Sequence, residues 1–182
     1  MYDRKEVQIF IIVGDSGSGK TTIAKMFSDK LKCECLGFSY AGRELSKYEP
    51  NSLPFTAIND YIYKCIENAV NRGTPVVVEG LSAISVFDRL EYAGYKMLVI
   101  YIDVPLEIRI RRIAKRQNCS LEIAKSIEKS KAEGKGKAGI DEVIKKADIA
   151  IDGTEEMSFV LKNVIETVRI HSSNNDNGIK ME

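Results

Sequence analysis

The stretch IFIIVGDSGSGKTTIAKMF, from Ile9 to Phe27, constrains the fold of this chain more than any other segment. Residues 7–13 form a near-continuous apolar run, as is typical of a strand buried on both faces. A turn rich in glycine and serine comes next, and from Thr21 to Leu31 the apolar residues recur at helical spacing. The sequence therefore predicts a buried strand, a glycine turn and a helix in direct succession.

The turn itself, GDSGSGKT, fits the pattern G-x-x-x-x-G-K-[ST] without a mismatch, and this pattern binds phosphate when it joins a strand to a helix. Glycines let successive backbone N–H groups point into one concavity, and the start of the helix adds the positive end of its dipole. Lys20 can reach the outer phosphates, and the Thr21 hydroxyl can bind Mg²⁺. We therefore predict a nucleotide site made of Gly14, Asp15, Ser16, Gly17, Ser18, Gly19, Lys20, Thr21 and Thr22.

Strand-like and helix-like segments alternate along the rest of the chain. Further strands are predicted over 34–38, 76–80, 97–105 and 147–152, and further helices over 57–71, 82–92, 106–117, 120–131, 140–146 and 155–171. Residues 131–139, KAEGKGKAG, are predicted as a flexible charged loop. Strands separated by helices predict an α/β fold, a doubly wound five-stranded parallel sheet with helices on both faces.

Composition limits the classes of partner. The net charge is +1, so overall charge implies neither a nucleic acid nor an anionic membrane surface. No apolar run approaches the roughly 20 residues that span a bilayer, and the charged start MYDRKEVQ does not resemble a secretory signal. We expect a cytoplasmic protein without a membrane partner; the sequence leaves the oligomeric state open.

Metal-ligating and nucleophilic side chains are few. The four cysteines, at 33, 35, 65 and 119, lack C-x-x-C spacing, and His171 is the sole histidine. A zinc site would have few ligands, so we expect buried or half-buried thiols in a reducing compartment. We assign His171 no catalytic role.

Three further segments carry a family resemblance: IYIDVPLEIRIRRIAKR at 100–116, KKADIAIDGTEE at 145–156 and FSYAGRELSKYE at 38–49. Together with GDSGSGKTT, they resemble P-loop kinases of the nucleoside monophosphate kinase group, which includes adenylate and cytidylate kinases and dephospho-CoA kinase. The resemblance implies one domain over 1–171, an acceptor-binding region at about 39–72 and a small lid at about 117–139. We predict a disordered tail over 172–182.

The resemblance also implies roles for residues on the donor side. Arg109, Arg112 and Arg116 lie three and four residues apart, so they share one helix face. Arg112 and Arg116 would clamp the phosphates and pack against adenine, and the alternative is a solvated basic face. Gly153 and Thr154 would lie beside adenine, although Thr154 can also cap the following helix.

On the acceptor side, Glu79 ends a predicted strand where related kinases carry an aspartate; it can hold magnesium, orient the acceptor or cap structure. Asp15 can accept a proton from an acceptor hydroxyl or stabilise the turn. Arg43 and Tyr40 would bind the acceptor's phosphate and base, or be an exposed salt-bridged arginine and a half-buried tyrosine. The predicted lid departs from the family because it carries lysines and no arginine: Lys129, Lys131, Lys135 and Lys137.

Together these features predict transfer of the γ-phosphoryl group of ATP to a small acceptor, with ATP and Mg²⁺ as cofactors and a nucleotide as the acceptor. The absence of a guanine-reading N-K-x-D favours ATP over GTP. One alternative is the same chemistry on dephospho-CoA. The other is an ATP-dependent switch or assembly factor that acts through a protein or RNA partner, with Glu79 activating water.

Overall fold

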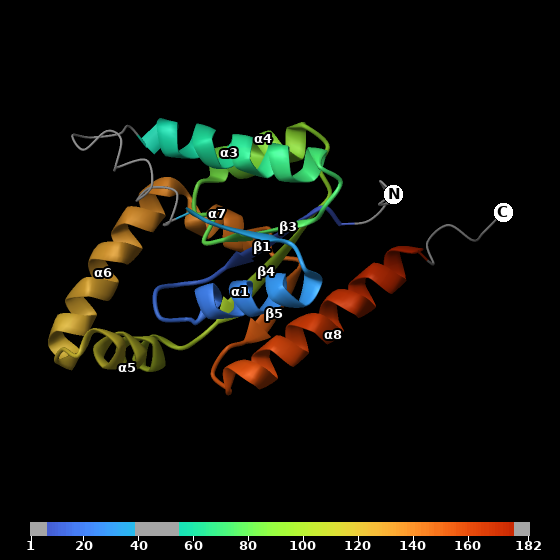
Figure 1. Cartoon of the computed structure of the whole chain (residues 1–182). Coiled ribbons are helices and arrows are strands. Elements are labelled where there is room, and N and C mark those ends of the chain that lie inside the picture. Colours follow the sequence, from blue (N-terminus) through green and yellow to red (C-terminus); the bar gives the residue numbers. More distant parts are fainter. Residues whose placement is uncertain (1–6, 39–54, 177–182) are drawn as a thin grey trace.

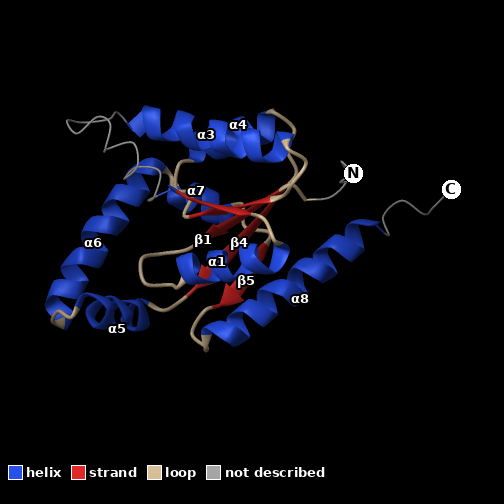
Figure 2. Ribbon diagram, viewed as in Figure 1, coloured by secondary structure: helices blue, strands red, loops and turns tan. Residues whose placement is uncertain are grey.

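One parallel sheet organises the chain in the computed structural model, which describes residues 7–38 and 55–176 (Figure 1). Its strands follow the order β2-β3-β1-β4-β5 (Figure 2). The strands are β1 (Ile9–Val13), β2 (Glu34–Gly37), β3 (Val76–Glu79), β4 (Met97–Asp103) and β5 (Ile149–Asp152). All five predicted strands and their parallel pairing are confirmed.

Helices cover both faces of this sheet, which confirms the doubly wound prediction. They are α1 (Lys20–Leu31), α3 (Phe55–Asn71), α4 (Ile84–Tyr92), α5 (Leu106–Gln117), α6 (Leu121–Ala138), α7 (Ile140–Lys145) and α8 (Met157–Asp176). In Figure 1, α3 and α4 lie on one side of the sheet, and α1 and α8 lie on the other. No helix in these described ranges is both long and apolar enough to cross a membrane.

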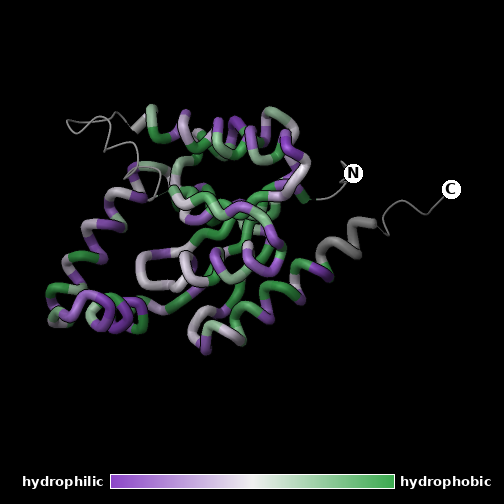
Figure 3. Tube along the Cα trace, viewed as in Figure 1, coloured by the Kyte–Doolittle hydropathy of each residue, from purple (hydrophilic) through white to green (hydrophobic). Residues whose placement is uncertain are grey.

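The central strand β1 shows why its sequence is apolar throughout. Ile9, Ile11 and Val13 face the core under α3, α4 and α7, whereas Phe10 and Ile12 face the core under α1 and α8. Every residue of β1 is buried, and burying one such side chain contributes about 1.5–3 kcal/mol. Figure 3 shows this pattern, with hydrophobic residues along the strands and hydrophilic residues on the outer helices.

Helices α5 and α6 form a hairpin, residues 106–138, beside the sheet (Figure 1). The hairpin has a small core of its own, in which Ile110 and Ile113 pack against Ala124. Ser120 caps α6 by accepting a hydrogen bond from the Ile123 N–H at 3.3 Å.

The flexible loop predicted over 131–139 is wrong, because α6 continues as a helix to Ala138. Two tertiary contacts outweigh the poor helix propensity of the two glycines: Glu128 is buried against Arg109, and Lys135 donates to the carbonyl of Gly14. The helix ends at Gly139, which adopts φ 93° and also starts α7.

The disordered tail predicted over 172–182 begins too early, because α8 runs to Asp176. No glycine or proline interrupts residues 157–176, so nothing in the backbone stops the helix at His171. Residues 177–182 lie outside the described ranges.

Alanine at Gly136 tests whether α6 is helical through its last turns. No atom lies within 4 Å of a Cβ built there, so Gly136→Ala should raise the free energy of unfolding by about 0.5–1 kcal/mol in urea denaturation. Gly139→Ala is the matched contrast. Its φ of +93° and a Cβ contact of 2.7 Å with Ile84 Cγ2 should make it destabilising by about 1 kcal/mol or more. A destabilising Gly136→Ala would contradict the helix.

Candidate functional site

The turn between β1 and α1, residues 14–19, lies at the carboxyl end of the central strand, where ligands bind in parallel α/β sheets. Gly17 and Gly19 adopt φ 87° and 90°, a region that side chains disfavour. A Cβ at Gly17 would lie 2.7 Å from the backbone carbonyl oxygen of Arg109. Glycine is therefore required both by the backbone angle and by the close approach of α5.

The two serines of the turn are buried, whereas the first two threonines of α1 are exposed. Ser16 and Ser18 are buried, and the Ser18 N–H donates to the Asp15 carbonyl at 3.2 Å. Thr21 and Thr22 are exposed on the first turn of α1. Ser16 and Gly17 of the turn line the cleft described below.

Lys20 lies at the centre of the site. Its Nζ donates to the Asp15 carbonyl at 3.2 Å and lies 3.9 Å from Glu79 Oε1. Burial lowers the pKa of Lys20, and the charges of Glu79 and Asp15 oppose that shift. An ammonium group held this way is poorly solvated and gains strongly from an added anion.

Thr21 and Glu79 form the candidate metal site. The Thr21 hydroxyl donates to Glu79 Oε1 at 2.9 Å, although β3 and α1 are far apart in sequence. A hydroxyl and a carboxylate are the oxygen donors that Mg²⁺ prefers, so the pair fits this ion. Within the described residues no group of three or more His, Cys, Asp or Glu could hold a metal, so phosphate oxygens and waters would supply the other ligands.

Arg109 is buried in ion pairs, although its helical spacing placed it on one face with Arg112 and Arg116. It is only 9% exposed, and its Nε donates to the Val104 carbonyl at 3.0 Å. Its guanidinium also pairs with Glu128 of α6 and lies 3.5 Å from the Asp15 carboxylate. Arg109 therefore ties α5, α6 and the turn together, a role that helical spacing alone did not reveal.

Arg112 links the turn to the loop that follows β5. It donates to the Ser18 carbonyl at 3.4 Å and to the Thr154 carbonyl at 3.2 Å, so three predicted donor-side residues lie together. Gly153 is closely packed there, since a Cβ would lie 2.5 Å from Ile102 Cγ2. Because α8 begins at Met157, Thr154 is not its cap; the Thr154 N–H instead donates to Asp152 at 2.9 Å.

The hairpin also supplies Lys135, a residue without an assigned role in the sequence reasoning. Its Nζ donates to the Gly14 carbonyl at 2.9 Å, across the mouth of the turn. Burial and the nearby charge of Lys20 lower the pKa of Lys135 to about 8.

A cleft of about 1250 Å³ is lined by Lys20, Thr21, Glu79 and Lys135, but not by Arg109, Arg112, Gly153 or Thr154. Its walls come from the turn and α1, the ends of β2 and β3, and the hairpin, which contributes Arg116. The wall away from the turn includes Lys25, Asp29, Cys33, Cys35 and Phe38. Cys35 is exposed, contrary to the expected burial of the thiols, whereas Arg43 and Tyr40 lie outside the described residues.

Comparison with known proteins agrees with this geometry. A family described as AAA domain (AAA_18) matches residues 10–135, more than half of the chain. The cytidylate kinase of Methanocaldococcus jannaschii is 31% identical over 137 residues, which cover 70% of this chain and 75% of that protein. The chain belongs to the P-loop kinase family.

Solved structures share the fold of this P-loop kinase at low sequence identity. An uncharacterized protein from Eubacterium ventriosum is 15% identical with a TM-score of 0.68, and covers 90% of this chain and 99% of its own. A gluconokinase from Sinorhizobium meliloti is 13% identical with a TM-score of 0.63, covering 97% and 99%. A shikimate kinase from Aquifex aeolicus is 19% identical with a TM-score of 0.55, covering 90% and 98%. They confirm the P-loop kinase fold.

Breaking the buried Arg109–Glu128 pair should destabilise this kinase. Glu128→Ala leaves a buried guanidinium without its partner, so the free energy of unfolding should fall by about 3–5 kcal/mol in urea denaturation. Glu34→Ala is the control, because the Arg72–Glu34 pair is exposed (side chains 61% and 46%) and should change stability by about 1 kcal/mol at most. Equal losses would mean that the buried pair is not a structural tie.

Proposed function

We propose that this P-loop kinase transfers the γ-phosphoryl group of ATP, with Mg²⁺, to a nucleotide acceptor. The observation that carries the proposal is the single cleft that contains Lys20, Thr21 and Glu79 together with Arg116 and Lys135 of the hairpin. At about 1250 Å³ it is larger than the roughly 300–1,000 Å³ of an ordinary one-ligand pocket, which leaves room for a donor and an acceptor.

The donor would bind with its phosphates against the turn. Phosphoryl transfer depends mainly on positioning and on neutralising the charge of the phosphate oxygens. The backbone N–H groups of residues 14–22 and the Lys20 ammonium would supply both. Arg112, Gly153 and Thr154, which the structure brings together, would lie beside the adenine ring.

Thr21 and Glu79 would hold Mg²⁺, which neutralises phosphate charge and orients the transferring group when bound. Their 2.9 Å hydrogen bond already places both oxygens in the cleft. Glu79 is only 6% exposed, so it can orient ligands without being drawn into bulk solvent.

The position of Asp15 favours support of the turn over proton acceptance. Its carboxylate lies 3.5 Å from the buried Arg109 guanidinium, and this ion pair ties the side chain to α5. A nucleotide acceptor needs no base, because its phosphate oxygen is already ionised near neutral pH. Arg43 and Tyr40 remain our candidates for binding this acceptor.

The acceptor we propose is cytidine monophosphate. The support is the 31% identity with a protein described as a cytidylate kinase, over 75% of that protein's length. The hairpin would act as a lid over the cleft, excluding the water that would otherwise hydrolyse ATP.

The test is an acceptor panel with ATP and Mg²⁺: CMP, UMP, AMP, GMP, dephospho-CoA, gluconate and shikimate. We expect CMP to give the highest kcat/KM, measured as formation of the diphosphate product. Lys20→Ala should lower kcat/KM by about 100-fold or more, because it removes a cation from the transferring group.

Lys30→Ala is the matched control, since Lys30 is exposed in the last turn of the same helix; it should leave the rate unchanged. If dephospho-CoA were the one acceptor of the panel that is phosphorylated, it would take the place of CMP as the proposed acceptor. ATP hydrolysis that no small acceptor alters, but that a protein or RNA partner raises, would contradict a kinase and favour a switch.

A further inference from the structure

Two lysine ammonium groups converge on the turn at 14–19. Lys20 Nζ donates to the Asp15 carbonyl at 3.2 Å, and Lys135 Nζ donates to the Gly14 carbonyl at 2.9 Å. Burial lowers the pKa of both lysines, and the charge of Lys20 further lowers the pKa of Lys135. Two like charges in a desolvated site repel each other unless an anion lies between them.

Two carboxylates lie near this pair, and each also contacts another side chain; Glu79 Oε1 lies 3.9 Å from Lys20 Nζ itself. Asp15 lies 3.5 Å from Arg109, and Glu79 accepts a hydrogen bond from Thr21 at 2.9 Å. Lys25, Arg116 and Lys131 add three more positive charges to the walls of the same cleft, and Asp29 adds one negative charge. The site is therefore short of negative charge, and a phosphate group, with several anionic oxygens, matches the deficit.

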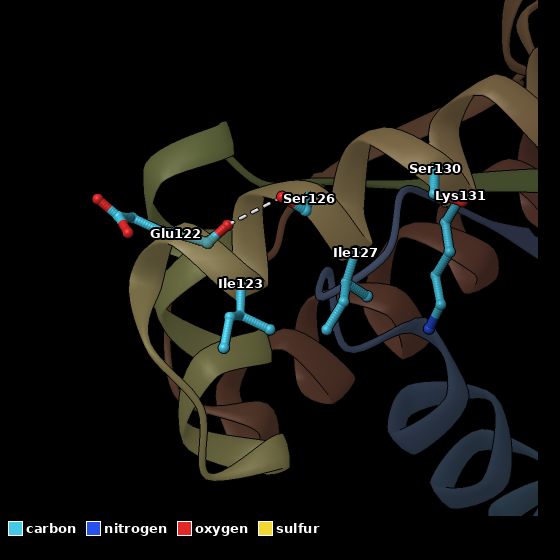
Figure 4. A pocket seen from close by; sticks show the side chains of 6 residues that line it. All are labelled: Glu122, Ile123, Ser126, Ile127, Ser130 and Lys131. Carbon is cyan, nitrogen blue, oxygen red and sulfur yellow. Dashed lines mark hydrogen bonds between the residues drawn. The ribbon is translucent and has the colours of Figure 1, made fainter.

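The position of Lys135 on α6 follows from helical spacing. Ile123, Ile127 and Lys131 project from one side of α6, four residues apart (Figure 4). Lys135 continues this row by another four residues, and both Lys131 and Lys135 line the cleft. Lys137 is also on α6 but is exposed and does not line the cleft.

We propose that Lys135 is a catalytic residue of the hairpin, whose ammonium binds the terminal phosphate of a bound nucleoside triphosphate together with Lys20. This rests on the proposed function. An acceptor phosphate oxygen forms a bond to the γ-phosphorus while the bond to the β,γ-bridging oxygen breaks, and that electron pair leaves with ADP. During the transfer step itself, Lys135 neutralises charge on the γ-oxygens and neither gives nor takes a proton.

A lysine in this role explains how α6, which contains no arginine, can still bind a phosphate group. Lysine acts as a point charge, so a single contact with one oxygen suffices, whereas arginine would clamp two. The 2.9 Å contact with Gly14 shows that the side chain reaches the turn without any rearrangement of α6.

The experiment compares affinities for the non-hydrolysable β,γ-imido analogue of ATP and for ADP, each with Mg²⁺, by titration calorimetry. Lys135→Ala should weaken the triphosphate about 10- to 100-fold, the effect of losing one charged hydrogen bond, and weaken ADP much less. Lys137→Ala removes the same charge from the same helix and should change neither affinity. Lys135→Arg should keep most of the triphosphate affinity.

A second readout separates a phosphate contact from a merely structural one. Because the pKa of Lys135 is about 8 beside Lys20, Asp15, Glu79 and Arg116, an added phosphate should raise it again. Triphosphate binding at pH 8.5 should therefore take up protons, measured in buffers of different ionisation enthalpy. The uptake should be smaller in Lys135→Arg, whose guanidinium does not titrate there.

The outcomes are separable. Equal weakening of triphosphate and ADP, or equal effects of Lys135→Ala and Lys137→Ala, would overturn the proposal while leaving the kinase function intact. Failure of the unaltered protein to bind either nucleotide would overturn the proposed function as well. If circular dichroism shows that Lys135→Ala is misfolded, Lys135→Arg tests the proposal instead. Retained preference for the triphosphate over ADP, with smaller proton uptake, would support it. Proton uptake equal to that of the unaltered protein would overturn it.

Discussion

The close contact between the turn at 14–19 and the backbone of α5 is the constraint on which the rest of the site depends. Gly17 approaches the Arg109 carbonyl so closely that a Cβ would lie 2.7 Å from it. This contact holds the turn against α5 at the edge of the cleft. It also fixes the hairpin relative to β1, and so determines which hairpin residues can reach a phosphate.

Positive charge near the turn is divided between structural and ligand-facing groups. Arg109 is buried, paired with Glu128 and close to Asp15, so its charge is already balanced. Lys20 and Lys135 instead donate to backbone carbonyls at the edge of the cleft, and the carboxylate that forms an ion pair with Lys20 is Glu79, 3.9 Å away. A cleft in which cations outnumber carboxylates is suited to bind a polyphosphate and hold it in one orientation.

Sequence reasoning succeeded where local pattern and burial agree. The runs at β1, β3 and β4 are apolar because the sheet buries them on both faces. The pattern G-x-x-x-x-G-K-[ST] is typical of a phosphate-binding turn between a strand and a helix, and the turn at 14–19 joins β1 to α1 in this way. It failed where tertiary contacts decide. Residues 131–138 read as a loop because of their glycines and lysines, yet the anchoring of Glu128 and Lys135 keeps them helical. Helical spacing likewise placed Arg109 on one face with Arg112. It could not reveal that Arg109 is buried, because its partner Glu128 lies on another helix.

The measurement that tests the central claim most directly is a titration of ¹⁵N-labelled protein with ATP and Mg²⁺, followed through the backbone amide resonances of residues 14–22. If these N–H groups bind the phosphates, the signals of Gly17, Gly19 and Lys20 should shift strongly and saturably, and Lys20→Ala should weaken that response. Saturable shifts elsewhere in the cleft with the signals of the turn unchanged would contradict the account.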